Sequence, residues 1–206
     1  RLPFDVQFET EHLYASIGEI ATLEDFATLA HPQWSEAMQL FYATSFEKFI
    51  SRQEKTVQMV YTGYRKALPT AANLEEFLVA VGVKDAVDFT VRERKEAFYR
   101  VTENRKETLV IAKNTWGHIE IAVESDSPFV TVEKDVITTD YFLGSTMLLN
   151  YYIHKNRMHA GINRARITFS CKGTIRVIEI MATFDCEDEM KEFPWRKDKK
   201  CLAQLT

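Results

Sequence analysis

The feature that most constrains this chain is a single change in the spacing of its apolar side chains. Up to about Gly82 they recur every three to four residues, which is the repeat of one face of a helix. From Asp85 onward they recur at every second residue, which is the repeat of one face of a β-strand. The sequence therefore predicts two parts, a helical segment over residues 10–84 and a β-rich domain over residues 85–185.

The helical segment is expected to contain about four short amphipathic helices. Thr22 is a good N-cap for the first helix, and Asn73 with Glu76 has the spacing of a capping box for the last, which ends before Gly82. The second helix is expected to run unbroken through residues 34–50. The aromatic richness of the segment indicates packing within it and against the β-rich domain, with a groove for a partner helix as the alternative.

The β-rich domain is expected to contain about seven short strands in roughly 90 residues. The clearest alternation runs through Ile119, Ile121 and Val123, with Glu120 on the opposite, solvent-facing side. Lys172-Gly173 has the composition of a tight turn between the last two strands. Because no helix-length segment separates these strands, the predicted fold class is α+β, with helices followed by an antiparallel, immunoglobulin-like β-sandwich.

The two ends of the chain are expected to belong to a longer protein. The sequence begins without Met, and residues 1–9 alternate as a strand of a preceding or adjacent β domain. Residues 186–206 are highly charged and indicate a linker or the start of another helical region. We therefore expect that this chain was cut from a larger parent.

Composition excludes several functional classes. The net charge of -4 argues against general nucleic-acid binding, and no apolar run is long enough to predict membrane insertion. The three cysteines lack the number and spacing of a disulfide framework or zinc site, so no metal or cofactor is expected and cytoplasmic location is favoured. Cys171 alternates with core residues and is expected to be buried.

The sequence carries no recognisable catalytic motif. No GxSxG, GxxxxGK[ST], GxGxxG or HExxH pattern occurs, and no carboxylate lies in an isolated apolar setting. Glu179, like Glu120, alternates with core residues and should face solvent. We therefore predict that the chain is not an enzyme and has no catalytic residues.

Two places are candidates for binding. Trp116 begins a strand and could stack on a sugar or anchor a partner, although packing across the sandwich is the simpler interpretation. His154, Arg157 and His159 form the densest basic stretch, followed by further arginines, and could bind an acidic partner or a phosphate. The alternative is that this stretch is a solvated connection between strands.

Most of the chain resembles a known family, including the helical stretches around Leu23 to Phe49 and Leu74 to Gly82. The residues that carry the resemblance are Val110 to Gly117, Ser125 to Val130, Ile137 to Gly144, Leu149 to Ile153 and His159 to Asn163. They resemble the N-terminal region of long, uncharacterised proteins from anaerobic Gram-positive bacteria, a family of unknown function. The resemblance implies immunoglobulin-like modules with helices between them, followed by a long helical body. It implies no reaction and no site residues.

Three hypotheses for function follow. The first is a non-catalytic structural or interaction module whose partners are other domains of the same parent chain, or another protein. The second is a carbohydrate-binding module, which requires at least two coplanar, exposed aromatic rings among Trp116, Tyr151 and Tyr152. The third is an enzyme with an unrecognised site, which requires a deep pocket lined by convergent polar groups.

Overall fold

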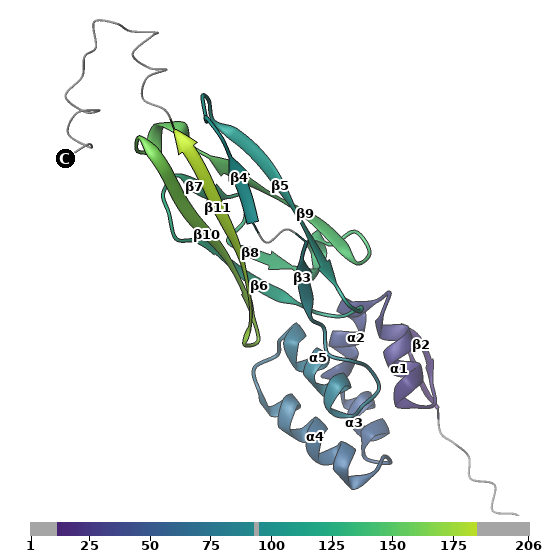
Figure 1. Cartoon of the computed structure of the whole chain (residues 1–206). Helices are drawn as coiled ribbons and strands as arrows, with labels where there is room; N and C mark the ends of the chain where they lie inside the picture. The colour runs from purple at the N-terminus through teal and green to yellow at the C-terminus, as the bar shows by residue number, and fades with distance from the viewer. Residues whose placement is uncertain (1–11, 93–94, 185–206) are drawn as a thin grey trace, which may run out of the picture. The chain divides into compact units, whose positions relative to one another are not determined.

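The computed structural model describes residues 12–92 and 95–184 (Figure 1). The predicted strand at residues 1–9 and the predicted linker or helix at residues 186–206 lie outside the described residues.

The chain forms two compact units. The helical unit consists of the residues up to Val87 together with Thr115–His118, and the β unit consists of Asp88–Asn114 and the residues from Ile119 onward. The four residues Thr115–His118 lie between two strands in the sequence, yet they belong to the helical unit.

The helical unit begins with a two-stranded hairpin, β1 (Leu13–Ala15) and β2 (Gly18–Ile20), which the apolar spacing does not predict. Five helices follow: α1 (Leu23–Ala30), α2 (Trp34–Phe41), α3 (Thr44–Ile50), α4 (Lys55–Lys66) and α5 (Ala71–Ala80).

The expectation of one unbroken helix over residues 34–50 is wrong, because α2 ends at Phe41 and α3 begins at Thr44. Between them Ala43 adopts an extended backbone with ψ 150°. Neither glycine nor proline marks this break, and the apolar spacing of three or four residues continues across it. The pattern therefore fits one helix as well as two.

The predicted N-cap of α1 is confirmed. The Thr22 hydroxyl accepts a hydrogen bond from the Asp25 backbone N–H at 3.1 Å, and the Asp25 carboxylate accepts one from the Thr22 N–H at 2.9 Å. This is a capping box in which aspartate replaces the more usual glutamate.

The predicted N-cap of α5 is wrong. Thr70, not Asn73, caps this helix, and its hydroxyl accepts from the Asn73 N–H at 3.3 Å. Pro69 allows the helix to begin soon after it, three residues earlier than expected. The Asn73 side chain instead donates to the Tyr42 hydroxyl at 2.8 Å and to the Leu68 carbonyl at 2.7 Å.

Aromatic rings form the centre of the helical unit. The rings of Phe41, Phe46, Tyr61 and Phe77 pack against one another with centroid separations between 5.2 and 6.4 Å. Tyr61 is buried, and its hydroxyl donates to the Phe41 carbonyl at 2.8 Å. Burial raises the pKa of Tyr61 to about 12. The aromatic richness of the sequence is thus used in packing within this unit.

The β unit contains two sheets (Figure 1). The five-stranded sheet has the order β4 (Lys95–Phe98), β11 (Thr174–Phe184), β10 (Gly161–Cys171), β6 (Glu120–Ser125) and β8 (Val136–Thr138). The four-stranded sheet has the order β3 (Phe89–Val91), β5 (Arg105–Lys113), β9 (Thr146–Ile153) and β7 (Val130–Val132). Two short 3₁₀ helices, η1 (Thr139–Tyr141) and η2 (Lys155–Arg157), lie in the connections.

The α+β fold predicted from the change in period is confirmed by these helices and mostly antiparallel sheets. The sequence does not predict two strands of the β unit, β3 and β4. Strand β4 pairs with β11 in parallel. The strands β3 and β4 have three and four residues, so alternation along them is a weak signal, as it also is for the equally short β7 and β8 that the sequence does predict.

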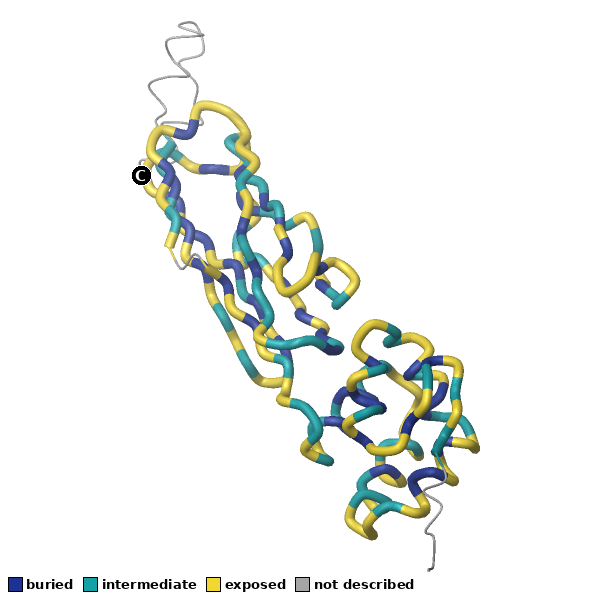
Figure 2. The backbone as a smooth tube through the Cα atoms, turned by 90° about the vertical axis from the view of Figure 1, so that its right-hand side faces the viewer, coloured by how far each residue is buried: buried dark blue, intermediate teal, exposed yellow. Residues whose placement is uncertain are grey.

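Each sheet buries one face, as Figure 2 shows by the alternation of colours along the strands. On β6, Ile121 and Val123 are buried while Glu120 is exposed, and on β11 Glu179 is exposed between two buried residues. Cys171 is buried as predicted, and burial raises the pKa of its thiol. Because both sheets have one apolar face, they bury these faces together in a sandwich-like core.

The turn predicted at Lys172-Gly173 is confirmed. Both residues have positive φ, 46° and 85°, as the central residues of a type I′ turn require. The turn sets the register of the longest hairpin, from Cys171 opposite Thr174 to Gly161 opposite Phe184.

Candidate functional site

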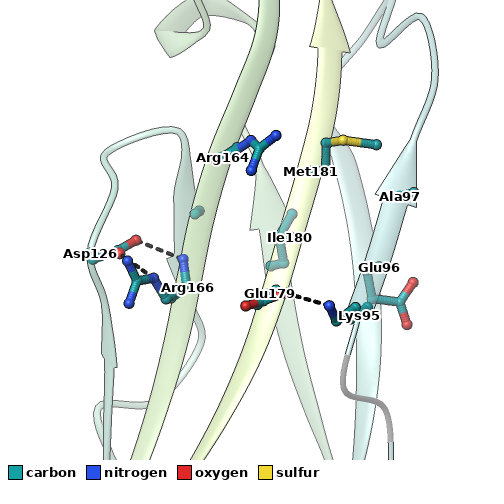
Figure 3. Close-up of a pocket in the computed structure, with 10 residues that line it drawn as sticks. Lys95, Glu96, Ala97, Asp126, Arg164, Arg166, Glu179, Ile180 and Met181 are labelled. Carbon is teal, nitrogen blue, oxygen red and sulfur yellow. Dashed lines mark hydrogen bonds and ion pairs between the residues drawn. The ribbon is translucent and has the colours of Figure 1, made fainter.

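A groove lies on the outer face of the five-stranded sheet (Figure 3). Its volume is about 620 Å³, and side chains of β4, β10 and β11 and the residue after β6 line it. The outward positions alternate with buried ones, such as Ala165 and Ile180, whose side chains belong to the core. The pleat of the strands thus places charged side chains in the groove.

A row of four charges crosses this groove from strand to strand. Arg166 lies opposite Glu179 in the register of β10 and β11, and Glu179 lies opposite Lys95 in the register of β11 and β4. Lys95 Nζ is 3.1 Å from Glu179 Oε2, and Arg166 Nε is 3.6 Å from Asp126 Oδ2. The Arg166 N–H also donates to Asp126 Oδ1 at 2.6 Å, which holds the fourth charge in the row.

These charges are paired but exposed to solvent. The exposed fractions of the side chains are 80% for Lys95, 58% for Glu179, 66% for Arg166 and 51% for Asp126. Water screens such pairs, so each contributes little to stability, and the groove presents both signs of charge to the solvent.

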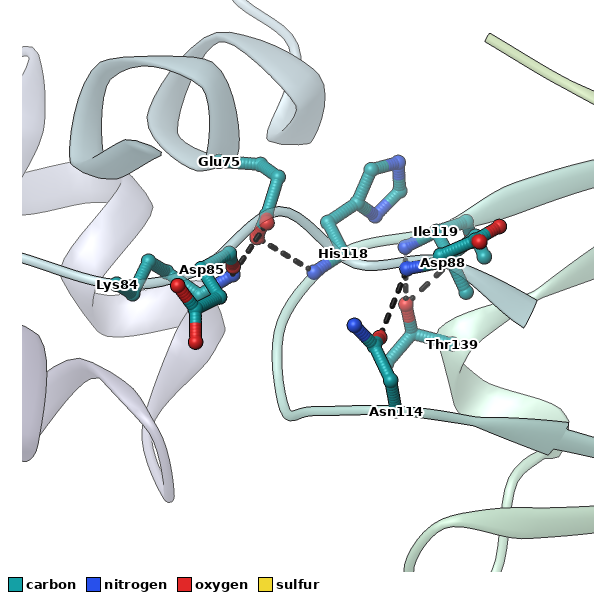
Figure 4. Close-up of polar contacts among 8 residues, drawn as sticks. All are labelled: Glu75, Lys84, Asp85, Asp88, Asn114, His118, Ile119 and Thr139. Atoms are coloured by element: carbon teal, nitrogen blue, oxygen red, sulfur yellow. Dashed lines mark hydrogen bonds and ion pairs between the residues drawn. The ribbon is translucent and has the colours of Figure 1, made fainter. Parts of the chain in front are cut away.

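A second polar cluster lies in the helical unit, where Glu75 and Lys84 form a buried ion pair (Figure 4). The exposed fraction of each side chain is 2%. Lys84 Nζ also donates to the Asp85 carbonyl at 3.0 Å, and Glu75 Oε2 accepts from the His118 backbone N–H at 3.0 Å. Each buried charge therefore has a second hydrogen-bond partner, which such a pair needs in order to be tolerated.

Gly117 closes over this ion pair. Its φ is +119°, and a Cβ built on it would overlap Glu75 Oε2 and lie 2.8 Å from Lys84 Nζ. Any other residue here would have to push a buried carboxylate and ammonium aside. Glycine is required at this position both by backbone conformation and by space.

Glu75 is 1% exposed but is not isolated, because Lys84 pairs with it, so it does not contradict the expectation that no carboxylate lies in an isolated apolar setting. Its burial is nevertheless not among the predictions. The sequence offers a signal: Glu75 follows Leu74 and shares the helix face of Leu78, three residues further on. Its partners are nine and 43 residues away, so spacing along the chain could not reveal them.

Trp116 packs within the helical unit. Its ring lies 5.0 Å from Lys84 Nζ, 5.0 Å from the His31 ring and 6.1 Å from the Trp34 ring, which meets it edge-on. Tyr151, a second residue of the carbohydrate hypothesis, is buried with an exposed fraction of 1%. These two aromatics therefore do not form the exposed stacking platform that a sugar would need.

The basic stretch lies in the β unit, in the connection between β9 and β10 that contains η2. His154 Nε2 is 2.7 Å from the Thr131 hydroxyl, and burial followed by the charge of Arg157 lowers the pKa of His154. Arg157 donates to the Pro128 carbonyl at 3.1 Å, and the His159 N–H donates to Asn163 Oδ1 at 2.9 Å. The His154 side chain is thus held by the Thr131 hydroxyl, the Arg157 side chain by a backbone carbonyl, and the His159 backbone by the Asn163 side chain. Trp116 belongs to the other unit.

Within residues 12–92 and 95–184, no three His, Cys, Asp or Glu side chains are grouped closely enough to hold a metal ion. Over the same residues, no helix is both long and apolar enough to cross a membrane.

Comparison with known protein families matches residues 1–206 to the N-terminal region of DUF5717, a family of unknown function. The chain belongs to this family. A search of curated proteins gives no match to the DUF5717 chain. The match extends over both units, so the helical and β units together form the region that the family shares.

Solved structures resemble parts of the DUF5717 chain. A protein of unknown function from Porphyromonas gingivalis W83 is 18% identical with a TM-score of 0.40, and the match covers 48% of this chain and 47% of that one. A PapD-like domain of human CEP192 is 6% identical with a TM-score of 0.39, covering 47% and 84%. A FixG-related protein from Vibrio parahaemolyticus is 16% identical with a TM-score of 0.35, covering 49% and 98%. At these scores the likeness carries no argument about function.

Proposed function

We propose that this chain is a non-catalytic structural and interaction module of a larger bacterial protein. The observation that supports this is how its charged side chains are used. The one strongly buried carboxylate among the described residues, Glu75, is occupied by Lys84 and by the His118 N–H, and the Gly117 backbone lies close against the pair. The charges in the open groove are exposed to solvent and paired with one another. Neither arrangement is suited to proton transfer or nucleophilic attack.

The strand order supports the immunoglobulin-like part of the proposal. In the four-stranded sheet, the first strand of the β unit, β3, pairs with β5, and β9 and β7 follow. In the five-stranded sheet, the last two strands, β11 and β10, lie beside β6. Such a division between two sheets is typical of immunoglobulin-like sandwiches, which serve as interaction modules in many unrelated proteins. The parallel pairing of β4 with the last strand extends that sheet by an edge strand.

We also infer that the parent combines such modules with helical segments, and that it comes from anaerobic Gram-positive bacteria. The sequence resemblance described above supports this inference. The partners proposed here are then neighbouring domains of the parent chain or other copies of it.

The test is a broad activity screen on the whole 206-residue chain with peptide, ester, phosphoester and glycan substrates. We expect no turnover above that of a heat-denatured sample and no binding on a glycan array. Turnover that follows the protein through purification would refute the proposal. A screen of Glu75→Gln beside the unaltered chain identifies whether any such activity comes from the buried ion pair.

A further inference from the structure

The outer face of the five-stranded sheet has a second property besides its groove. The described residues expose eleven large apolar side chains, and four of them lie on this face: Val136 on β8, Ile162 on β10, and Ile175 and Val177 on β11. The exposed fractions are 55% for Ile162 and 59% for Ile175. These apolar side chains lie on different sides of the charged groove, so the groove is flanked by apolar surface.

The row of charges lies between these apolar side chains. Ile162 lies on one side of Arg166 along β10, and Val177 and Ile175 lie on the other side of Glu179 along β11. Across the strands the charges alternate in the order Asp126, Arg166, Glu179, Lys95, which is negative, positive, negative, positive (Figure 3).

This order is complementary to itself. If a second copy faces the first about a twofold axis that runs along the strands between β10 and β11, the row is reversed in the second copy. Arg166 then faces Glu179 of the second copy, Asp126 faces its Lys95, and each contact occurs twice. No like charges meet. The same axis places Val177 opposite Thr168.

We propose that this outer face is a self-association surface through which two copies of the chain pair face to face. The proposal rests on the interaction role proposed above and names the partner as a second copy. The ion pairs within each copy hold the four side chains in place before contact, which lowers the entropy lost on association. The β10–β11 hairpin, with 11 residues in each strand, supplies a face about 36 Å long.

The first experiment measures the mass of the whole chain by analytical ultracentrifugation at concentrations up to about 1 mM, where even a weak interface associates. We expect a monomer–dimer equilibrium that weakens as salt is added, because salt screens the attraction between the exposed charges of the two rows. A chain that remains monomeric over the whole range overturns the proposal. It would leave the non-catalytic role untouched, because the activity screen tests that role separately.

The second experiment uses charge reversal. In Arg166→Glu each twofold contact joins two glutamates, and in Glu179→Arg each joins two arginines, so each variant alone is expected to be monomeric. An equimolar mixture should dimerise again, because every contact then joins a glutamate to an arginine. Association of the unaltered chain, its loss in each variant and its recovery in the mixture together are what a pairing of position 166 with position 179 predicts.

Matched controls carry the same charge changes elsewhere. Lys106→Glu and Glu103→Arg alter exposed residues outside this sheet and should dimerise as the unaltered chain does. Circular dichroism of all four variants establishes that they are folded. If the two groove variants remain dimeric, or if their mixture stays monomeric while the controls dimerise, the proposed pairing is wrong.

Discussion

Gly117 is the position where a single methyl group has the largest predicted consequence. Replacing it with alanine forces a side chain into a backbone with φ +119° and into the space of the Glu75 carboxylate. We expect Gly117→Ala to lower the free energy of unfolding by about 2–4 kcal/mol, because strain and the disturbed ion pair act together. Urea denaturation followed by circular dichroism measures this.

The matched control is Gly63→Ala in α4. A Cβ there meets nothing within 4 Å, and the helical backbone suits alanine. We expect a gain of about 0.5–1 kcal/mol. Equal effects of the two substitutions would contradict the account of Gly117.

Tyr61 makes stability depend on pH. Burial raises its pKa to about 12, whereas in the unfolded chain it is about 10. Between these values the unfolded chain releases a proton that the folded chain keeps, so stability is complete below pH 10 and falls as the pH rises toward 12. The loss attributable to this hydroxyl is about 2 kcal/mol.

Tyr61→Phe tests this assignment by denaturation between about pH 9 and pH 12. The stability of the variant should not show the decrease above pH 10 that comes from this hydroxyl. At neutral pH the variant should be less stable than the unaltered chain, because the hydrogen bond to the Phe41 carbonyl is gone. Tyr99→Phe, at a side chain that is 71% exposed, should leave the pH dependence unchanged. An identical pH dependence in Tyr61→Phe and the unaltered chain would count against the assignment.

At the scale of elements, strand β6 offers a test of its two faces. Ile121 is 0% exposed, and its neighbour Ala122 faces solvent. Ile121→Asp places an unpaired charge in the core and should cost more than about 3 kcal/mol. Ala122→Asp should cost less than about 1 kcal/mol. Thermal unfolding of both variants checks this, and similar melting temperatures would contradict the assignment of the buried face.

How far the sequence predicts an element depends on its length. The strands β9, β10 and β11 have eight or more residues, enough for alternation to define them. Three-residue strands lie at the limit of this signal, because β7 and β8 are among the predicted strands whereas β1, β2 and β3, equally short, are not. In α5, Thr70 and Asn73 are both good caps three residues apart, and only the contacts of Asn73 with other elements decide between them.

The sites divide in the same way. The pairing of Arg166 with Glu179 follows from the Lys172-Gly173 turn, because a two-residue turn fixes every pair in the hairpin. Lys95 and Asp126 join this row because β4 and β6 flank the hairpin. Local sequence patterns do not predict which strands lie beside the hairpin. The pairing of Glu75 with the His118 backbone likewise depends on tertiary structure alone.

At the scale of the whole molecule, the helical unit is not continuous in sequence. It includes Thr115–His118, which follow β3, β4 and β5 in the sequence. A fragment that ends at Val87 therefore contains every helix but lacks the Trp116 ring and the His118 N–H. In that fragment the Glu75–Lys84 pair loses a hydrogen bond and the cover that excludes water.

We expect the fragment of residues 1–87 to unfold at a lower temperature than the helical unit does within the whole chain. The reason is that a buried ion pair is tolerated only while all its partners are present. Replacing the pair by apolar residues, Glu75→Leu with Lys84→Met, removes that requirement. This double variant should stabilise the fragment by about 1–3 kcal/mol and change the whole chain much less. Scanning calorimetry of the four proteins gives the comparison, and an equal effect of the double variant in both contexts would show that the segment Thr115–His118 contributes nothing to the pair.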